Sequence, residues 1–312
     1  MIYPKILFVT NRNDFATDYL ILKLRNYDDN IPYLRINSED IDKLSIKTDL
    51  IKSSILTVED ADYDISSLVS GYFRRAPSVF DKPLSDKDTN FINRERRHFL
   101  EGFYESLKIK WVNPIFSTYK AERKMYQLSL AKEVGFDIPK TIVTNSPQEI
   151  KTFIKNFTCI IKPISNGLIV NDKKIYSIYT SEIKENDINN YSDIYEMPLF
   201  VQQKIPKIYD IRATVVGDKI FATGIKVHDN QNTEWRDENI KKEYFMHELP
   251  NKICNEIYSL HQKLNLVYSA FDFILTPEGQ YVFLETNPAG EWVWLEKELN
   301  IDISKALLKE LL

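Results

Sequence analysis

The stretch FDFILTPEGQYVFLETNPAGEW, residues 271–292, carries the strongest structural signal in this chain. Two apolar, β-rich runs, residues 271–276 and 281–287, flank residues 277–280. The proline and glycine of that linker are turn formers, one because its φ is fixed and the other because positive φ costs it little. The pattern predicts a β-hairpin.

The predicted hairpin brings two acidic residues together. With the turn centred on its linker, Asp272 lies opposite Glu285, and strand alternation places Asn287 on the same face. Two like charges in these positions repel unless a cation lies between them. Oxygen atoms from a carboxylate pair and an amide suit Mg²⁺ or Mn²⁺. The alternative is an exposed strand face with solvated acids, and a one-residue slip in register would separate the pair.

Length and composition indicate a globular protein of two domains or one large domain. The chain has 312 residues, 43% of them hydrophobic and 28% charged, with a formal charge of −4 that gives no reason to expect nucleic acid as a partner. Cys159 and Cys254 have no metal-site spacing and are expected as buried thiols in a cytoplasmic protein. No apolar run predicts a signal segment or a membrane span. Only 8 glycines argue against several Gly-rich phosphate loops.

The first third of the chain predicts a small α/β domain. Residues 5–10 are an apolar run of strand length, residues 15–24 have helical periodicity, and residues 33–36 form a second strand candidate. Further strand candidates are residues 54–58 and 68–73. The βαβ beginning has no G-x-G-x-x-G, so it does not indicate a dinucleotide fold.

Arg74 and Arg75 follow the last of these strand candidates. Paired guanidinium groups at a strand end could receive a carboxylate or a phosphate, since they bind such groups through parallel hydrogen bonds. They could equally be a solvated strand end, and the sequence by itself favours the solvated interpretation.

Longer elements follow. Residues 85–107 predict a helix with an apolar stripe of Phe91, Phe99, Phe103 and Leu107. Residues 118–134 predict a second helix, residues 227–246 a polar loop, and Gly217-Asp218 the turn of another hairpin. Residues 159–163 form an apolar strand that ends at Lys162, and a lysine at the end of a buried strand needs an anion beside it.

The order of these motifs resembles the ATP-grasp superfamily, specifically its carboxylate–amine ligases related to the ribosomal-protein glutamate ligase. The resemblance runs over residues 111–287 and rests on seven motifs in order: Lys124 in ERKMYQLSLAKEVGFDIP, Lys162 in IIKP, the segment VQQK at 201–204, DIR at 210–212, Trp235-Arg236, Asp272, and ETN at 285–287. The looser motifs at residues 11–17, 33–37 and 72–75 resemble the microviridin, or graspetide, macrocyclases among the peptide maturases.

The resemblance implies an α/β fold with α+β subdomains. A pre-ATP-grasp α/β domain, residues 1–110, precedes an ATP-grasp domain, residues 111–312. In the latter, subdomains at about 118–200 and 201–312 clasp ATP between them.

The resemblance also implies a role for each motif residue. Lys124 and Lys162 contact the phosphates, with Lys162 near the α-phosphate. The residues expected at the adenine hinge and ribose are Gln202, Gln203, Lys204, Ile205 and Asp210. Arg212 and Arg236 are the expected catalytic cations at the transferred phosphoryl group, and Asp272, Glu285 and Asn287 hold two Mg²⁺ ions, with Mn²⁺ as a possible substitute. The family often has Glu where this chain has Gln203.

The implied function is an ATP-dependent ligase that activates Asp or Glu side chains of a ribosomally made precursor peptide as acyl phosphates. Ester or amide links to Ser, Thr or Lys then close rings and release ADP and phosphate. The implied partners are the leader and core of that peptide and a second copy of the chain in a homodimer. Two alternatives stay open: a ligase that adds amino acids to a protein or small-molecule carboxylate, and a catalytically silent nucleotide- or peptide-binding module.

Overall fold

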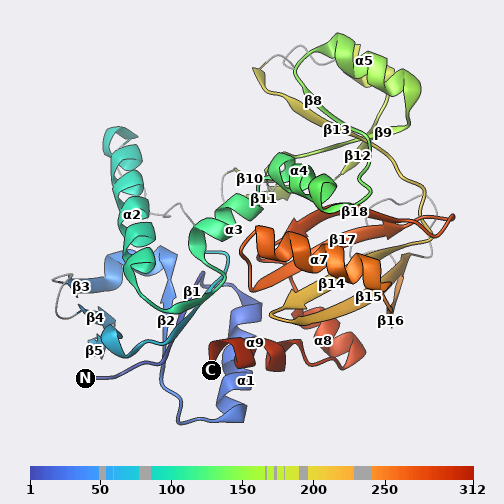
Figure 1. The fold of residues 1–312 in the computed structure, drawn as a ribbon. Helices are drawn as coiled ribbons and strands as arrows, with labels where there is room; N and C mark the ends of the chain where they lie inside the picture. Colours follow the sequence, from blue (N-terminus) through green and yellow to red (C-terminus); the bar gives the residue numbers. More distant parts are fainter. Residues whose placement is uncertain are drawn as a thin grey trace.

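The computed structural model describes residues 1–48, 54–58, 60–76, 86–165, 167–171, 174–178, 180–189, 196–227 and 241–312. Figure 1 shows an N-terminal part around β1 (Ile6–Thr10) and α2 (Asp86–Ser106), a small lobe that carries α5 (Pro147–Asn156), and a C-terminal sheet beneath α7 (Asn251–Lys263). Within these ranges, no helix is both long and apolar enough to cross a membrane.

A parallel four-stranded sheet organises the N-terminal part. Its order is β2 (Tyr33–Asn37), β1 (Ile6–Thr10), β6 (Ser70–Phe73) and β7 (Lys110–Val112). Every residue of β1 is buried, as its continuous apolar run predicts. Helix α1 (Phe15–Tyr27) connects β1 to β2 and completes the expected βαβ beginning.

A second, antiparallel sheet lies beside the first. It contains β3 (Leu44–Thr48), β4 (Ser54–Val58) and β5 (Ala61–Asp64), and the short 3-10 helices η1 (Ser38–Lys43) and η2 (Ile65–Ser67) flank it. The strand predicted at 54–58 therefore exists, but it belongs to this separate sheet and not to the parallel one.

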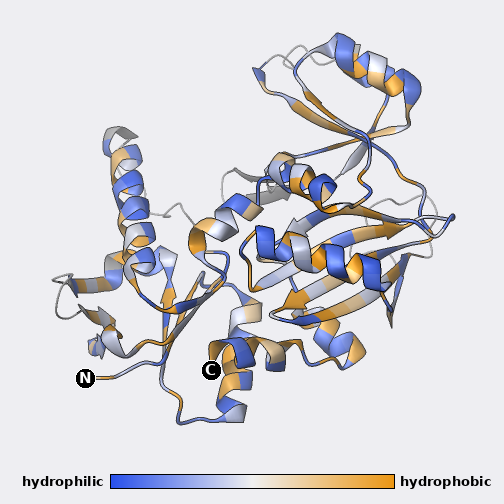
Figure 2. Cartoon of the chain, viewed as in Figure 1, coloured by the Kyte–Doolittle hydropathy of each residue, from blue (hydrophilic) through white to orange (hydrophobic). Residues whose placement is uncertain are grey.

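Helix α2 (Asp86–Ser106) confirms the long predicted helix but corrects its apolar stripe. Phe103 is buried at 7% exposure, whereas Phe91 and Phe99 are exposed to 56% and 42%. The first aromatic residues of the stripe are therefore exposed, and Figure 2 shows hydrophobic and hydrophilic stretches alternating along the projecting length of α2.

The helix predicted at residues 118–134 is two helices, α3 (Ile115–Ala121) and α4 (Lys124–Val134). Arg123 separates them because its backbone is extended, with ψ of 97°, and it serves as the N-cap of α4. Both helices bury one side, so the apolar periodicity continues across the break and hides it. Gly135 ends α4 with φ of +107°, a conformation that glycine adopts readily.

The small lobe is an antiparallel sheet covered by one helix. Its order is β12 (Ser181–Ile183), β9 (Cys159–Lys162), β13 (Leu199–Gln203) and β8 (Thr141–Thr144), and α5 (Pro147–Asn156) packs on it. The hairpin β10 (Leu168–Asn171) and β11 (Lys174–Ser177) and the short helix α6 (Glu185–Asn189) complete the lobe. Cys159 is buried as expected, while Cys254 on α7 is half-buried.

The C-terminal sheet is antiparallel and five-stranded. Its order is β16 (Lys242–Met246), β15 (Lys219–Val227), β14 (Tyr209–Val216), β17 (Tyr268–Leu275) and β18 (Tyr281–Asn287). The β14–β15 hairpin turns at Gly217, with φ of +57°, as predicted. Strand β16 corrects the loop predicted at 227–246, whose residues 228–240 lie outside the described chain.

The two faces of this sheet have different neighbours. Helix α7 (Asn251–Lys263) covers one face together with α4. Helices α8 (Val293–Leu299) and α9 (Ile303–Leu311) lie under the other face, and they also pack against β1 and α1. The C-terminal helices thereby join the C-terminal sheet to the N-terminal part in one apolar core (Figure 1).

Candidate functional site

The hairpin β17–β18 places Asp272 directly opposite Glu285, as the sequence predicts. Near the turn the strands pair in a register one residue out of step with this arrangement, since Phe273 faces Phe283. A β-bulge between Asp272 and Phe273 absorbs the difference and leaves Leu284 without a partner residue. The acidic pair therefore depends on the bulge as well as on the turn.

Alternation along β17 explains why its acid faces a site and not a core. Phe271 and Phe273 are fully buried in the cluster under α7, where they pack against Phe283. Ala270 and Asp272 point to the opposite face. Asp272 is only 4% exposed, so this carboxylate is held in a confined polar environment.

Arg212 lies beside Asp272 on the next strand. The two residues are register partners of β14 and β17, and the Arg212 Nη1 atom is 3.2 Å from Asp272 Oδ1. Thr223 is the register partner of Arg212 on β15. One row across four strands thus contains, in order, Thr223, Arg212, Asp272 and Glu285. In this row one guanidinium is followed by two carboxylates.

Asn287 lies on the same face as Glu285, two residues along β18. Its side-chain oxygen accepts a hydrogen bond from the Ala289 N–H at 2.9 Å and keeps a second lone pair for another partner. In the described part of the chain there is no cluster of three or more His, Cys, Asp and Glu that could hold a metal. The oxygen set of Asp272, Glu285 and Asn287 fits a hard cation that takes its remaining ligands from phosphate or water.

Gln127 on α4 fixes the strand between the two expected ligands of β18. Its side-chain Nε2 donates to the Thr286 carbonyl at 2.8 Å, and its Oε1 accepts from the Thr286 N–H at 3.0 Å. Gln127 is 3% exposed, and Nε2 also donates to the Ala121 carbonyl. This residue stands in the quoted ERKMYQLSLAKEVGFDIP motif without an assigned role. A glutamine among buried positions of a helix was the available signal.

The two lysines expected at the phosphates belong to neighbouring segments. Lys124 is the first residue of α4, and its Nζ donates to the carbonyls of Pro163 at 2.5 Å and Ser165 at 3.3 Å. Lys162 ends β9 immediately before that loop. The structure therefore brings Lys124 to the loop that follows Lys162.

The expected adenine hinge follows β13. The N–H groups of Gln203 and Lys204 already donate to the carbonyls of Lys140 and Thr158, each at 2.8 Å. Of their backbone groups, these two residues can thus offer an adenine only the carbonyls. Among the described residues no acceptor takes the Ile205 N–H, which leaves it as the donor of this segment.

Two further hinge residues have defined partners. Gln202 is 1% exposed, its Nε2 donates to Thr141 Oγ1 at 3.0 Å, and within the described residues no donor reaches its Oε1. Asp210 is the second residue of β14, lies on the same face as Arg212 and forms an ion pair of 2.6 Å with Lys207. Lys207 carried no role in the sequence. Arg236, the other expected catalytic cation, lies outside the described residues.

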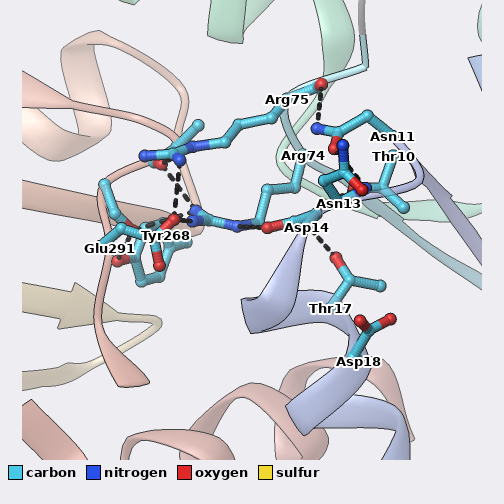
Figure 3. A network of polar contacts seen from close by, with 12 residues as sticks. Thr10, Asn11, Asn13, Asp14, Thr17, Asp18, Arg74, Arg75, Tyr268 and Glu291 are labelled. Atoms are coloured by element: carbon cyan, nitrogen blue, oxygen red, sulfur yellow. Dashed lines mark hydrogen bonds and ion pairs between the residues drawn. The ribbon is translucent and has the colours of Figure 1, made fainter. Parts of the chain in front are cut away.

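Arg74 corrects the interpretation of a solvated strand end. It is 1% exposed, and Figure 3 shows its guanidinium between Asp14 and Glu291. Burial raises the pKa of Asp14, but attraction to Arg74 and hydrogen bonds from Thr17 and Thr10 outweigh burial and lower this pKa overall. Arg74 therefore receives carboxylates, the interpretation that the sequence disfavoured.

Known proteins share this fold, although no protein-family model matches the chain. The chain is similar to the macrocyclase MdnC of Microcystis aeruginosa MRC, solved with its precursor peptide MdnA, with a TM-score of 0.87 and 26% identity over 98% of this chain and 99% of that one. A RiPP-associated ATP-grasp ligase of Chryseobacterium gregarium, in complex with ADP and a leader and core peptide, gives a TM-score of 0.86 and 27% identity over 99% and 96%. The alpha-aminoadipate–LysW ligase LysX of Sulfolobus acidocaldarius is 27% identical over 220 residues, 67% of this chain and 76% of that protein. The chain is therefore an ADP-forming ATP-grasp ligase, related in both fold and sequence to the RiPP peptide macrocyclases.

Proposed function

We propose that this protein uses Mg²⁺ and ATP to join acidic side chains of a ribosomally made precursor peptide to hydroxyl or amino side chains of the same peptide. The observation that carries the proposal is the row Arg212, Asp272 and Glu285 on the face opposite α7. A guanidinium followed by two carboxylates suits a metal-bound triphosphate, because the carboxylates can hold the metal while the guanidinium binds a phosphate oxygen. Similar proteins that hold a precursor peptide, or ADP with a leader and core peptide, support the choice of substrates.

Asp272, Glu285 and Asn287 would hold the metal, and the number of ions we propose is two, with Mn²⁺ as a substitute for Mg²⁺. Their donor set consists of oxygen atoms, which both ions prefer. When bound, the metal neutralises phosphate charge and lowers the barrier to phosphoryl transfer.

The protein's own cations would supply the rest of the electrostatic stabilisation. Lys124 and Lys162 neutralise phosphate oxygens from the side of the small lobe, and Arg212 meets the transferred phosphoryl group from the sheet. Arg236 is proposed for the same group on the basis of the sequence. Fixed cations need no reorganisation when charge develops in the transition state, which is why they accelerate the reaction.

The nucleotide would lie between the small lobe and the C-terminal sheet. The Ile205 N–H and the Gln203 and Lys204 carbonyls offer one donor and two acceptors for the adenine edge. Asp210 offers a carboxylate to the ribose hydroxyls. Gln202 lies behind this edge, where its bond to Thr141 fixes β13 against β8.

The proposed reaction has two steps. A carboxylate oxygen of the peptide attacks the γ-phosphorus of ATP, the bond to the β-phosphate oxygen breaks, and ADP leaves. A hydroxyl or amine then attacks the acyl carbon, releases phosphate and loses its proton. One molecule of water is lost from the peptide for each ester or amide that forms.

The test is incubation of the full chain with Mg·ATP and the short peptides encoded beside its gene. We expect ADP release together with a mass loss of one water per linkage. Hydroxylamine should intercept the acyl phosphate as a hydroxamate. Unchanged peptide mass and no ADP with any of these peptides would reject the proposal.

A second candidate follows from the similarity to LysX. A ligase that adds an amino acid to a protein or small-molecule carboxylate would use the same ATP-site residues. The mass of its acceptor would rise by one residue, whereas cyclisation lowers the mass. Light scattering of the purified chain tests the homodimer that we propose for either activity.

A further inference from the structure

We infer that Arg74 is a positioning residue for the metal site, because it holds the backbone that follows Asn287 in place from the N-terminal part of the molecule. The inference rests on the proposed function, since it assigns this role relative to the Mg²⁺ ligands. Nothing in the sequence motifs of the ATP site includes Arg74, which lies more than 200 positions before its contacts on this backbone.

Most of the hydrogen bonds that the Arg74 guanidinium donates go to the segment after Asn287. Its Nη1 donates to the carbonyls of Ala289 at 2.6 Å and Gly290 at 3.0 Å, and its Nη2 donates to Glu291 Oε1 at 2.5 Å. The Nε donates to Asp14 Oδ1 at 3.2 Å. A single guanidinium therefore binds three consecutive residues of one loop and an acid from the other end of the chain (Figure 3).

The N-terminal part holds Arg74 rigidly. Asp14 is 4% exposed, and its second oxygen accepts hydrogen bonds from Thr10 at 2.7 Å and Thr17 at 2.5 Å. The carboxylate is thus fixed by β1 and α1 before it meets the guanidinium. Buried charges that are paired and fully hydrogen-bonded hold a single geometry, because every alternative leaves a buried charge unpaired.

The bound loop touches the catalytic face of the sheet. A Cβ atom on Gly290 would lie 2.5 Å from the Ala270 Cβ and 3.5 Å from both Arg212 Nη1 and the Asn287 Cβ. The Gly290 backbone is therefore seated against the strand beside Asp272, within contact of the guanidinium that pairs with Asp272. The Tyr268 hydroxyl is a second donor to the Gly290 carbonyl, at 2.7 Å.

Displacement of this loop would be transmitted to Asn287 by short links. The Asn287 side-chain oxygen accepts from the Ala289 N–H, and the Asn287 carbonyl accepts from the Gly290 N–H at 3.3 Å. Arg74 binds the carbonyls of the same two residues. The orientation of Asn287 and the packing around Arg212 thus depend on a guanidinium whose hydrogen bonds go to Asp14, Ala289, Gly290 and Glu291 and not to the expected metal ligands themselves.

Arg74→Lys tests the role because lysine keeps the charge opposite Asp14 but cannot bind three loop residues from one planar group. The measurements are the Mg²⁺ concentration that half-saturates thermal stabilisation with a non-hydrolysable ATP analogue, and hydrogen exchange of the amides at residues 288–292. We expect the half-saturating Mg²⁺ concentration to rise about 10–100-fold, as for partners of metal ligands generally, and those amides to exchange faster. Stabilisation by the analogue without Mg²⁺ should change less than about twofold.

Glu296→Gln is the matched control. Glu296 is also buried, at 7% exposure, and links α8 to α9 through the Ser304 N–H at 2.6 Å and the Ser304 hydroxyl at 2.7 Å. Its carboxylate binds Tyr19, Lys23 and Ser304, and the one bond from Glu296 to the segment 288–292 among the described residues is that of its backbone N–H to the Trp292 carbonyl, which the substitution keeps. We expect this variant to lose stability while its half-saturating Mg²⁺ concentration stays that of the wild type.

The outcomes separate the two proposals. An Mg²⁺ response in Arg74→Lys equal to that of the wild type, or an equal shift in Glu296→Gln, overturns the positioning role and leaves the proposed function standing. A wild-type chain that gains no stability from Mg²⁺ with the analogue overturns both. Should Arg74→Lys fail to fold, Asp14→Asn must show the same shift in smaller degree, and an unchanged response there overturns the role.

Discussion

Asp272 and Glu285 face each other across β17 and β18, and the Arg212 guanidinium on β14 lies 3.2 Å from the Asp272 carboxylate. Two carboxylates on neighbouring strands favour the binding of a cation between them. The acidic pair therefore offers a divalent cation two oxygen ligands from adjacent strands. This relationship underlies most of the behaviour that we expect from the protein.

Glu285→Gln removes the charge opposite Asp272 without changing the size of the side chain. We expect this variant to lose the stabilisation by Mg²⁺ with a non-hydrolysable ATP analogue, because a neutral amide is a weaker ligand for a hard cation than a carboxylate. Thermal unfolding with and without both ligands measures the effect. Glu278→Gln, in the exposed turn, is the control and should keep the stabilisation. A Glu285→Gln chain that Mg²⁺ with the analogue stabilises as much as the wild type would contradict the role of Glu285 at the metal.

Arg212→Met should destabilise the fold as well as abolish turnover. Asp272 would lose its ion pair at 4% exposure, and removal of one partner of a buried pair costs on the order of 3–5 kcal/mol. Arg212→Lys keeps a charge near Asp272, so it should retain most of the stability while the rate falls by about 10²–10³. Urea unfolding and ADP release separate the two variants. Equal stability loss in both would show that the ion pair is not the source of the effect.

Gln127→Met should weaken the link between α4 and β18. The substitution preserves length but leaves the buried Thr286 N–H and carbonyl without their partner, which costs about 1–3 kcal/mol each in mutational series. We expect a lower urea midpoint and a reduced rate, because Thr286 lies between the two proposed metal ligands Glu285 and Asn287. Gln148→Met on the exposed start of α5 is the control. A Gln127→Met chain as stable and as active as that control would argue against the clamp.

His261 gives the protein a defined response to mild acid. Burial lowers its pKa from 6.5 to about 4, and its Nδ1 is 2.7 Å from the Ser269 hydroxyl. The folded state then binds fewer protons than the unfolded state between these values, so stability is complete above about pH 6.5 and falls as the pH drops toward 4.

The loss over this window should be on the order of 3 kcal/mol, and urea midpoints measured from pH 4 to 7 follow it. His261→Gln should flatten the profile there. The lowered pKa of Asp14 acts below its usual value of 3.8 and leaves this window unaffected. A wild-type midpoint that stays constant from pH 7 to pH 4 would contradict the assignment.

The sequence predicts the parts of this site that follow from local rules. The turn former Gly279 and the alternation of β17 are local properties, and they predict that Asp272 lies opposite Glu285. The sequence pattern does not reveal the bulge at Leu284, because Leu284 is an apolar residue like Phe283 before it in β18 and nothing in the residue types marks it as unpaired. The prediction of the pair was correct although the register near the turn differs by one residue.

Contacts between distant segments could not be predicted in this way. The sequence favours a solvated strand end for Arg74, because the residues at a strand terminus do not indicate which distant segment packs against them. Its partners Ala289 and Glu291 come from the other end of the chain. The division of residues 118–134 into two helices was missed for a related reason, since both bury the same side and keep one periodicity.

The most direct test of the central claim is mass spectrometry of a neighbouring precursor peptide after incubation with the full chain and Mg·ATP, with ADP measured in parallel. The account predicts the loss of one water and the release of one ADP per linkage. It also predicts neither product with Glu285→Gln. A peptide that gains mass would assign the chain to amino-acid addition, and linkage formation that persists in Glu285→Gln would contradict the role of the Asp272–Glu285 pair.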